Sequence, residues 1–253
     1  MKIKPDTLSN YLKATLENHT YHARKEPDLM WMIHKMDGIF HDEVFAPDYE
    51  VNAATMVLAM NSYMMLSSAV HMALSGHQVA VLPVARNALE SACYAFLTSS
   101  DEEMSAIWFN RDKSKTAAGK CRRNFTIGAT EAKLKHISPD MADYVRSVYE
   151  ATIEYGAHPN IKAISYHLSH QGEVDDKYHV YTQCGVYGEN SYQVNAALLL
   201  CVDIGQAIAF LLSASAKDHP FITERLAVFQ SWVDEKDRVT DHIEAELQKQ
   251  SSE

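Results

Sequence analysis

The chain has 253 residues, of which 47% are hydrophobic and 22% are charged, and this balance excludes a wholly disordered protein. Nine glycines and seven prolines are too few for a β-sandwich or a glycine-rich nucleotide fold, whereas eleven methionines favour helices. A formal net charge of −10 gives no bulk reason to expect binding to nucleic acid or to an anionic membrane.

The first 48 residues predict two amphipathic helices, over 6–24 and 27–40. The apolar stripe of the first helix contains three leucines: Leu8, Leu12 and Leu16. We therefore expect residues 1–48 to form an N-terminal helical arm, followed by a bundle domain over 49–253.

Three long apolar segments, 52–74, 78–98 and 191–216, predict the central helices of the bundle. Gly76 suits the turn between the first two. No Asp, Glu, Lys or Arg occurs from 51 to 85, so this region resembles a membrane span in length and charge. Its many Asn, Ser and His residues, and a mean hydropathy of −0.25 for the chain, indicate covered helices instead. We expect no membrane contact.

Residues 161–183 alternate in polarity around a Gly/Asp turn and predict a β-hairpin. The predicted fold class is therefore all-α, a helical bundle with long central helices and one inserted β-hairpin. The four cysteines are widely spaced and form no CxxC pair, which indicates free thiols and a cytoplasmic location.

The last predicted helix has a heptad pattern with a polar middle. It either lines a dimer seam or packs back onto its own bundle, and the sequence leaves both open. Its seam positions are Ile222, Leu226, Phe229, Val233, Lys236, Thr240, Ile243 and Leu247.

Charged residues inside the apolar helices are the first candidate site. Arg86 and Glu90 are the only charges in 78–98 and share one helix face, and Asp203 is the only charge in its helix. Buried charges must be paired, so we expect Arg86 to pair with Asp203 or with Glu90. The set, with the neighbouring Asn87, is either a ligand-binding pocket or a structural ion network.

A second candidate is a stripe of residues spaced by four: Arg146, Glu150, Glu154 and His158. Glu154 beside His158 has the spacing to orient an imidazole for acid–base work, and both are candidate ligand-binding residues. The alternative, favoured for Arg146 and Glu150, is a solvated face.

A third candidate is the basic segment 111–123, which offers local positive charge to phosphate groups. A solvated basic helix is the alternative. The candidate nucleic-acid-binding residues are Arg111, Lys115, Lys120, Arg122 and Arg123.

The thirteen histidines raise the question of a metal site. His167 and His179 have positions that allow them to face each other across the hairpin, with His158 just before it. No zinc, P-loop, dinucleotide or hydrolase motif accompanies them. We therefore predict no metal and no cofactor.

Two segments, ARNALESACYAFL (85–97) and EYGAHPN (154–160), resemble parts of uncharacterised bacterial helical-bundle families. These families look related to the HEPN superfamily, and in them an Arg…Glu pair and a His-Pro step recur, here Arg86, Glu90 and His158-Pro159. The resemblance covers residues 50 to 215 and implies a bundle and a homodimer.

Many HEPN proteins are RNases with four to six residues between an Arg and a following His, and no arginine of this chain has such a histidine, since Arg238 and His242 are separated by only three. The resemblance therefore carries over no nuclease site. We expect a cytoplasmic bacterial HEPN-like protein that binds RNA, a nucleotide or a small ligand, and whether it is an enzyme stays open. The alternative is a non-catalytic homodimeric interaction protein with a structural ion network.

Overall fold

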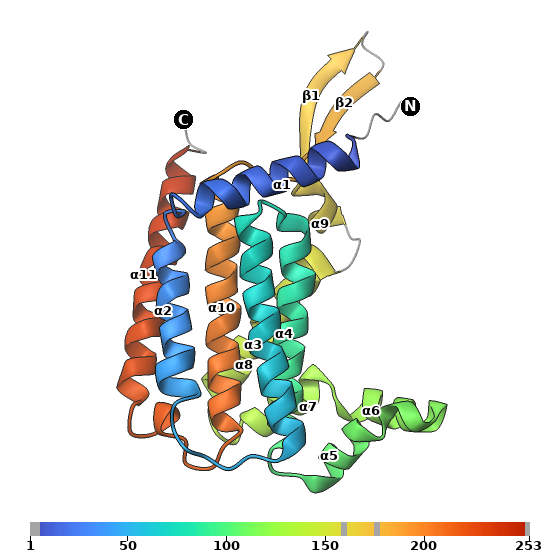
Figure 1. Cartoon of the computed structure of the whole chain (residues 1–253), viewed down its shortest axis with the longest axis vertical. Helices are drawn as coiled ribbons and strands as arrows, with labels where there is room; N and C mark the ends of the chain where they lie inside the picture. The colour runs from blue at the N-terminus through green and yellow to red at the C-terminus, as the bar shows by residue number, and fades with distance from the viewer. Residues whose placement is uncertain (1–5, 158–160, 175–177, 251–253) are drawn as a thin grey trace.

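The computed structural model describes residues 6–157, 161–174 and 178–250, and it shows the predicted all-α bundle with one two-stranded hairpin (Figure 1). In this part of the chain the α-helices are α1 (Leu8–His22), α2 (Met30–Ile39), α3 (Ala53–Leu74), α4 (Gln78–Thr98), α5 (Glu102–Phe109), α6 (Lys115–Asn124), α7 (Ile127–Leu134), α8 (Pro139–Thr152), α9 (Ile161–Ser165), α10 (Tyr192–Ala214) and α11 (Leu226–Gln250). The π-helices η1 (Phe40–Val44) and η3 (Ile153–Ala157) continue α2 and α8, the 3-10 turns are η2 (Arg111–Lys113) and η4 (Pro220–Ile222), and the strands are β1 (Leu168–Val174) and β2 (Tyr178–Gln183).

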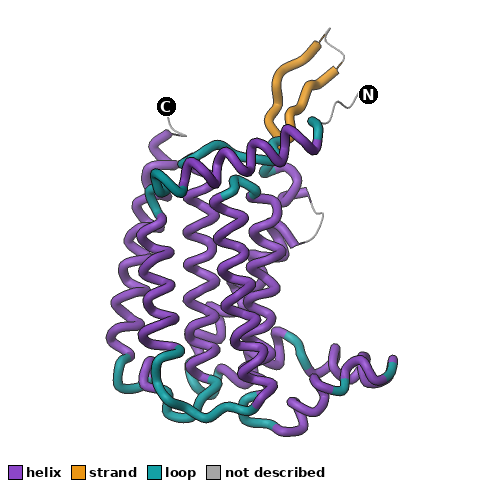
Figure 2. The backbone as a smooth tube through the Cα atoms, in the orientation of Figure 1, coloured by secondary structure: helices purple, strands orange, loops and turns teal. Residues whose placement is uncertain are grey.

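Helix α10 is the centre of the bundle, and it packs against α2, α3, α4, α8 and α11. The long helices run side by side, while α1 crosses one end of them and α5 and α6 project at the other (Figures 1 and 2). Among the described residues, α3 and α10 are long and apolar enough to cross a membrane by length and composition alone. The most apolar window of α10 is 83% buried, as in the core helix of a bundle, and that of α3 is 39% buried.

The ends of α3 and α4 follow from local sequence signals. Asn52 caps α3 by accepting a hydrogen bond from the Thr55 amide at 2.9 Å. At the other end the His77 amide donates to the Met72 carbonyl at 3.0 Å, and Gly76 has a φ of +78°. A side chain at position 76 would also place its Cβ 2.2 Å from the Tyr187 carbonyl oxygen. Position 76 therefore requires glycine both for its backbone conformation and for lack of space.

The N-terminal segment packs differently from its predicted stripe. Leu8, Leu12 and Leu16 of α1 are exposed, whereas Asn18 and His22 are buried. Asn18 Nδ2 donates to the Ser75 carbonyl at 3.2 Å, and His22 Nδ1 bonds the Leu74 carbonyl at 2.7 Å. The unpaired carbonyls at the end of α3 thus select the polar face of α1. Within the segment predicted as an arm, α2 and η1 contribute to the main hydrophobic core.

The hairpin is shorter than predicted, because residues 161–165 form α9 instead of a strand. Ile161 and Ile164 are three residues apart, a spacing that so short a segment cannot assign to either structure. Helix α11 packs back onto its own bundle: Phe229 is 4% exposed and Trp232 is 2% exposed. Part of the predicted heptad seam is therefore used within the chain.

Candidate functional site

Arg86 and Glu90 form a polar cluster with Tyr149 of α8. Arg86 Nε donates to Glu90 Oε1 at 2.9 Å, and Arg86 Nη2 donates to Tyr149 Oη at 2.8 Å. The guanidinium lies 4.8 Å from the centre of the Tyr149 ring, and Tyr149 Oη donates to Glu90 Oε1 at 3.2 Å. Burial lowers the pKa of Arg86, but Glu90 and Tyr149 raise it by more. The Arg86 guanidinium therefore stays charged, and the side chains of Arg86, Glu90 and Tyr149 are all hydrogen-bonded to one another.

Asp203 lies in a second cluster and not with Arg86. Lys236 Nζ of α11 donates to Asp203 Oδ1 at 2.8 Å, and Tyr144 Oη of α8 donates to the same oxygen at 3.1 Å. The Lys236 side chain is only 6% exposed. Burial lowers the pKa of Lys236, but the Asp203 and Asp237 carboxylates together raise it by more. Burial and Asp203 raise the pKa of Tyr144. Of the two pairings left open for Arg86, the structure shows the one with Glu90.

The other predicted ligand-binding residues do not join Arg86. Asn87 is exposed, because adjacent helix positions point about 100° apart. Glu154 lies in η3 and pairs with Lys162 of α9, with 43% of its side chain exposed. His158 lies outside the described residues.

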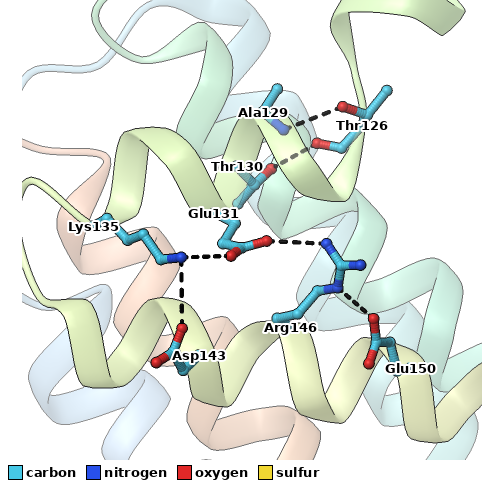
Figure 3. Close-up of polar contacts among 8 residues, drawn as sticks. All are labelled: Thr126, Ala129, Thr130, Glu131, Lys135, Asp143, Arg146 and Glu150. Carbon is cyan, nitrogen blue, oxygen red and sulfur yellow. Dashed lines mark hydrogen bonds and ion pairs between the residues drawn. The ribbon is translucent and has the colours of Figure 1, made fainter.

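The first two residues of the predicted stripe join a surface clasp between α7 and α8 (Figure 3). Arg146 Nη1 donates to Glu131 Oε2 at 3.0 Å and Arg146 Nε to Glu150 Oε1 at 2.5 Å. Lys135 Nζ lies 2.7 Å from Glu131 Oε1 and 3.8 Å from Asp143 Oδ1. Arg146 and Glu150 are exposed, with 42% and 58% of their side chains accessible, as a solvated face would be.

A cavity of about 240 Å³ opens between α4, α8, η3 and α10, close to where α9 ends. Gly156 allows this arrangement: a Cβ there would lie 2.5 Å from Leu82 Cβ, so only glycine lets η3 approach α4. π-helices occur frequently at functional sites. The apolar wall is formed by Val81, Leu82, Ala151, Ala196, Ala197 and Leu200.

Five polar but uncharged side chains complete the cavity: Gln78, Tyr155, Tyr166, His167 and Gln193. Gln78 is 7% exposed, and its Nε2 is a buried donor with no hydrogen-bond partner among the described residues. His167 is 8% exposed, its Nδ1 lies 2.8 Å from Tyr187 Oη, and burial lowers the pKa of its ring. Tyr155 and Tyr166 are half exposed and lie where the cavity meets solvent. In the described part of the chain, the cavity therefore has apolar walls, no ionic side chain, and a lining glutamine with an unsatisfied donor.

Sequence reasoning selected none of these five for ligand binding. Gln78 and Gln193 begin two long helices and look like ordinary polar ends, while His167 was considered as a metal ligand. The available signal was Gly156, because a glycine permits close backbone approach. It does not say which residues line the resulting space.

The basic segment projects from the bundle as η2 and α6 (Figure 1). A small second core of Leu97, Ile107, Cys121 and Phe125 holds it. Lys120 Nζ pairs with Glu103 at 2.9 Å, and the other five basic side chains form no ion pair within the described part of the chain. Residues 111–124 carry a net charge of +5, which leaves −15 for the remainder.

The hairpin histidines do not meet as predicted. His167 precedes β1 and lines the cavity, so its predicted contact with His179 is wrong. His179 Nδ1 instead lies 3.4 Å from His170 Nε2. Over the described ranges, no group of three or more His, Cys, Asp or Glu side chains is placed to hold a metal ion.

Comparisons with protein-family models, with curated proteins and with solved structures found no match to this chain. The resemblance to HEPN-like families stays a prediction, and function must be argued from the cavity and the surface.

Proposed function

We propose that the protein binds a small uncharged ligand in the cavity between α4, α8, η3 and α10. The carrying observation is Gln78, a lining residue of the cavity whose buried side-chain nitrogen Nε2 has no hydrogen-bond partner among the described residues. A buried donor without a partner costs about 1–3 kcal/mol, and a ligand oxygen that accepts from it removes that cost.

The lining defines the class of ligand. A cavity of about 240 Å³ is somewhat smaller than the sites that hold drug-sized molecules. No lining side chain among the described residues is ionic, and the lowered pKa of His167 keeps that ring neutral near pH 7. A carboxylate, phosphate or ammonium group would therefore be desolvated without a counter-charge. The ligand is a compact apolar molecule with a carbonyl or hydroxyl oxygen.

The test compares neutral and charged probes of similar shape. Benzamide and benzyl alcohol are expected to bind the full chain in ligand-observed NMR, whereas benzoate and benzylamine are not. Ala197→Phe fills the cavity and abolishes binding, while the exposed Ala132→Phe on α7 is the matched control. Gln78→Leu weakens benzamide binding roughly tenfold, the value of one hydrogen bond. Equal binding of benzoate, or no binding of any neutral probe, contradicts the proposal.

A second function, binding of RNA, is favoured by the basic segment. Lys115, Arg122 and Arg123 lie within about 100° of one another around α6 and form no ion pair with the described residues. Such a surface contacts phosphates and confers no base specificity.

The test is fluorescence anisotropy with a single-stranded RNA at two salt concentrations. Arg122→Glu with Arg123→Glu is expected to abolish binding, and wild-type binding is expected to weaken as salt rises. The matched control is Arg146→Glu with Lys135→Glu, which reverses two charges in the surface clasp of Figure 3. Binding that survives the α6 substitutions contradicts this second function.

A further inference from the structure

Helix α3 presents an apolar stripe to solvent. Met56, Val57, Met60 and Met64 are 51%, 48%, 58% and 64% exposed, although methionine and valine are usually buried. Their spacing of three and four residues places them on one side of the helix. We infer that this side of α3, together with the adjoining side of α4, is the interface of a two-fold homodimer.

The adjoining residues of α4 extend the stripe into a two-helix face. Val79, Pro83 and Asn87 of α4 are exposed and uncharged. Asn61 Nδ2 of α3 donates to Ser91 Oγ of α4 at 2.8 Å, which ties the two helices together. The two charged side chains of α4 form the cluster with Tyr149 of α8 and leave this face neutral.

The size of the face is close to what a stable dimer needs. α3 and α4 have 22 and 21 residues. Each is therefore about 30 Å long, and two packed helices are about 20 Å wide, which gives roughly 600 Å². A standard interface buries about 800 Å² on each partner. Side chains at the edges of the two helices supply the rest of the buried surface area.

The absence of charge argues for a second copy of the chain. A two-fold contact brings the same surface of both copies together, and residues on the axis meet their own equivalents, so a face with charges of one sign would repel itself. No Asp, Glu, Lys or Arg occurs from residue 51 to 85, in a chain that is otherwise rich in both signs. A membrane surface is a poorer fit, because helices that bind it carry Lys and Arg around the apolar stripe.

The distribution of large and small side chains fixes the direction of the contact. Met64 lies at the middle of α3, large residues precede it, and Ser67 and Ser68 follow it. If a two-fold axis crosses antiparallel helices at Met64, Met60 of each copy meets Ser68 of the other. Large side chains then fill the space above small ones, as close packing requires.

The first experiment is sedimentation of the full chain over a range of micromolar concentrations. Wild type is expected to be a dimer, and Met60→Asp with Met64→Asp is expected to weaken it roughly 100-fold or more, because like charges meet across the axis. Val180→Asp with Tyr181→Asp, two exposed hairpin residues, is the matched control and leaves the dimer intact. A monomeric wild type, or an Asp variant that remains dimeric, overturns the inference.

A crosslink tests the position of the axis without adding charge. In a Cys184→Ser background, Met64→Cys is expected to form an intermolecular disulfide, since a residue on the axis lies beside its own equivalent. Ala132→Cys on α7 is the control and does not crosslink. A monomer that sediments with neutral phosphatidylcholine vesicles would assign the face to a membrane and overturn the dimer.

Discussion

The two polar clusters that flank α8 are built alike but placed differently. Each contains a salt bridge and a tyrosine of α8, Tyr149 on one side and Tyr144 on the other. The Arg86–Glu90 bridge joins residues of one helix, and its side chains are 18% and 35% exposed. The Lys236–Asp203 bridge joins α11 to α10, and its lysine is 6% exposed.

This difference separates a local contact from a tertiary one. The Arg86–Glu90 pair forms whenever α4 is helical, so the folded state gains mainly the bond to Tyr149. The Lys236–Asp203 pair exists only when α10 and α11 are packed together. Removing one partner there leaves a charge inside the bundle, whereas Glu90 can be hydrated. We therefore expect the second cluster to carry more of the stability.

The largest effect is expected for Lys236→Met. It leaves the Asp203 carboxylate without its cation and lowers the free energy of unfolding by about 2–4 kcal/mol, somewhat reduced because Asp203 is 29% exposed. Adding Asp203→Asn recovers much of this loss, because no unpaired charge remains. Urea denaturation measures all variants. Asp241→Asn, which removes an exposed carboxylate of the same helix, is the control. A Lys236→Met protein as stable as wild type would refute the comparison.

Lys236 also shows where sequence reasoning ends. Helix ends such as Asn52 and Gly76 follow from residues within one turn, so the central helices were predicted closely. The pairing of Lys236 with Asp203 depends on how α11 lies against α10, and a heptad pattern shows only a polar interruption. The cavity lining is harder still, since Gln78 and His167 meet through the packing of separate elements. The α1 stripe was misleading because the carbonyl ends of α3 select polar partners.

A smaller effect is expected for Arg86→Met. Glu90 remains partly exposed and keeps the Tyr149 hydroxyl, so the free energy of unfolding falls by about 1 kcal/mol. Arg86 does not line the cavity, so benzamide binding should be unchanged. Arg146→Met, on the exposed clasp of Figure 3, is the control and should have no measurable effect on stability. Loss of ligand binding with unchanged stability would show instead that Arg86 serves the site.

The smallest effect is a pH dependence that neither ion cluster produces. The raised pKa values of Lys236 and Arg86 keep both side chains charged from pH 5.5 to 7.5, so neither one titrates in this range. His219 is 1% exposed, its Nε2 lies 3.1 Å from the Val44 carbonyl, and its Nδ1 accepts from the Phe221 amide at 3.2 Å. The bond that Nδ1 accepts needs the neutral ring, whereas Nε2–H donates to Val44 in either state. Burial lowers the pKa of His219 below the ordinary 6.5, against the raising effect of the Val44 bond.

Between that lowered pKa and 6.5 the unfolded chain binds a proton at His219 that the folded protein does not, so stability is full above 6.5 and falls as the pH decreases. One such group contributes a slope of at most about 1.4 kcal/mol per pH unit. Urea midpoints from pH 7.5 to 5.5 measure the slope. His219→Gln, less stable at pH 7.5, should show a shallower decline, because one of the titrating rings is gone. Lys236→Met should keep the wild-type slope despite its lower stability, and a flattened slope in that variant would mean that the buried lysine, and not the histidine, senses the proton.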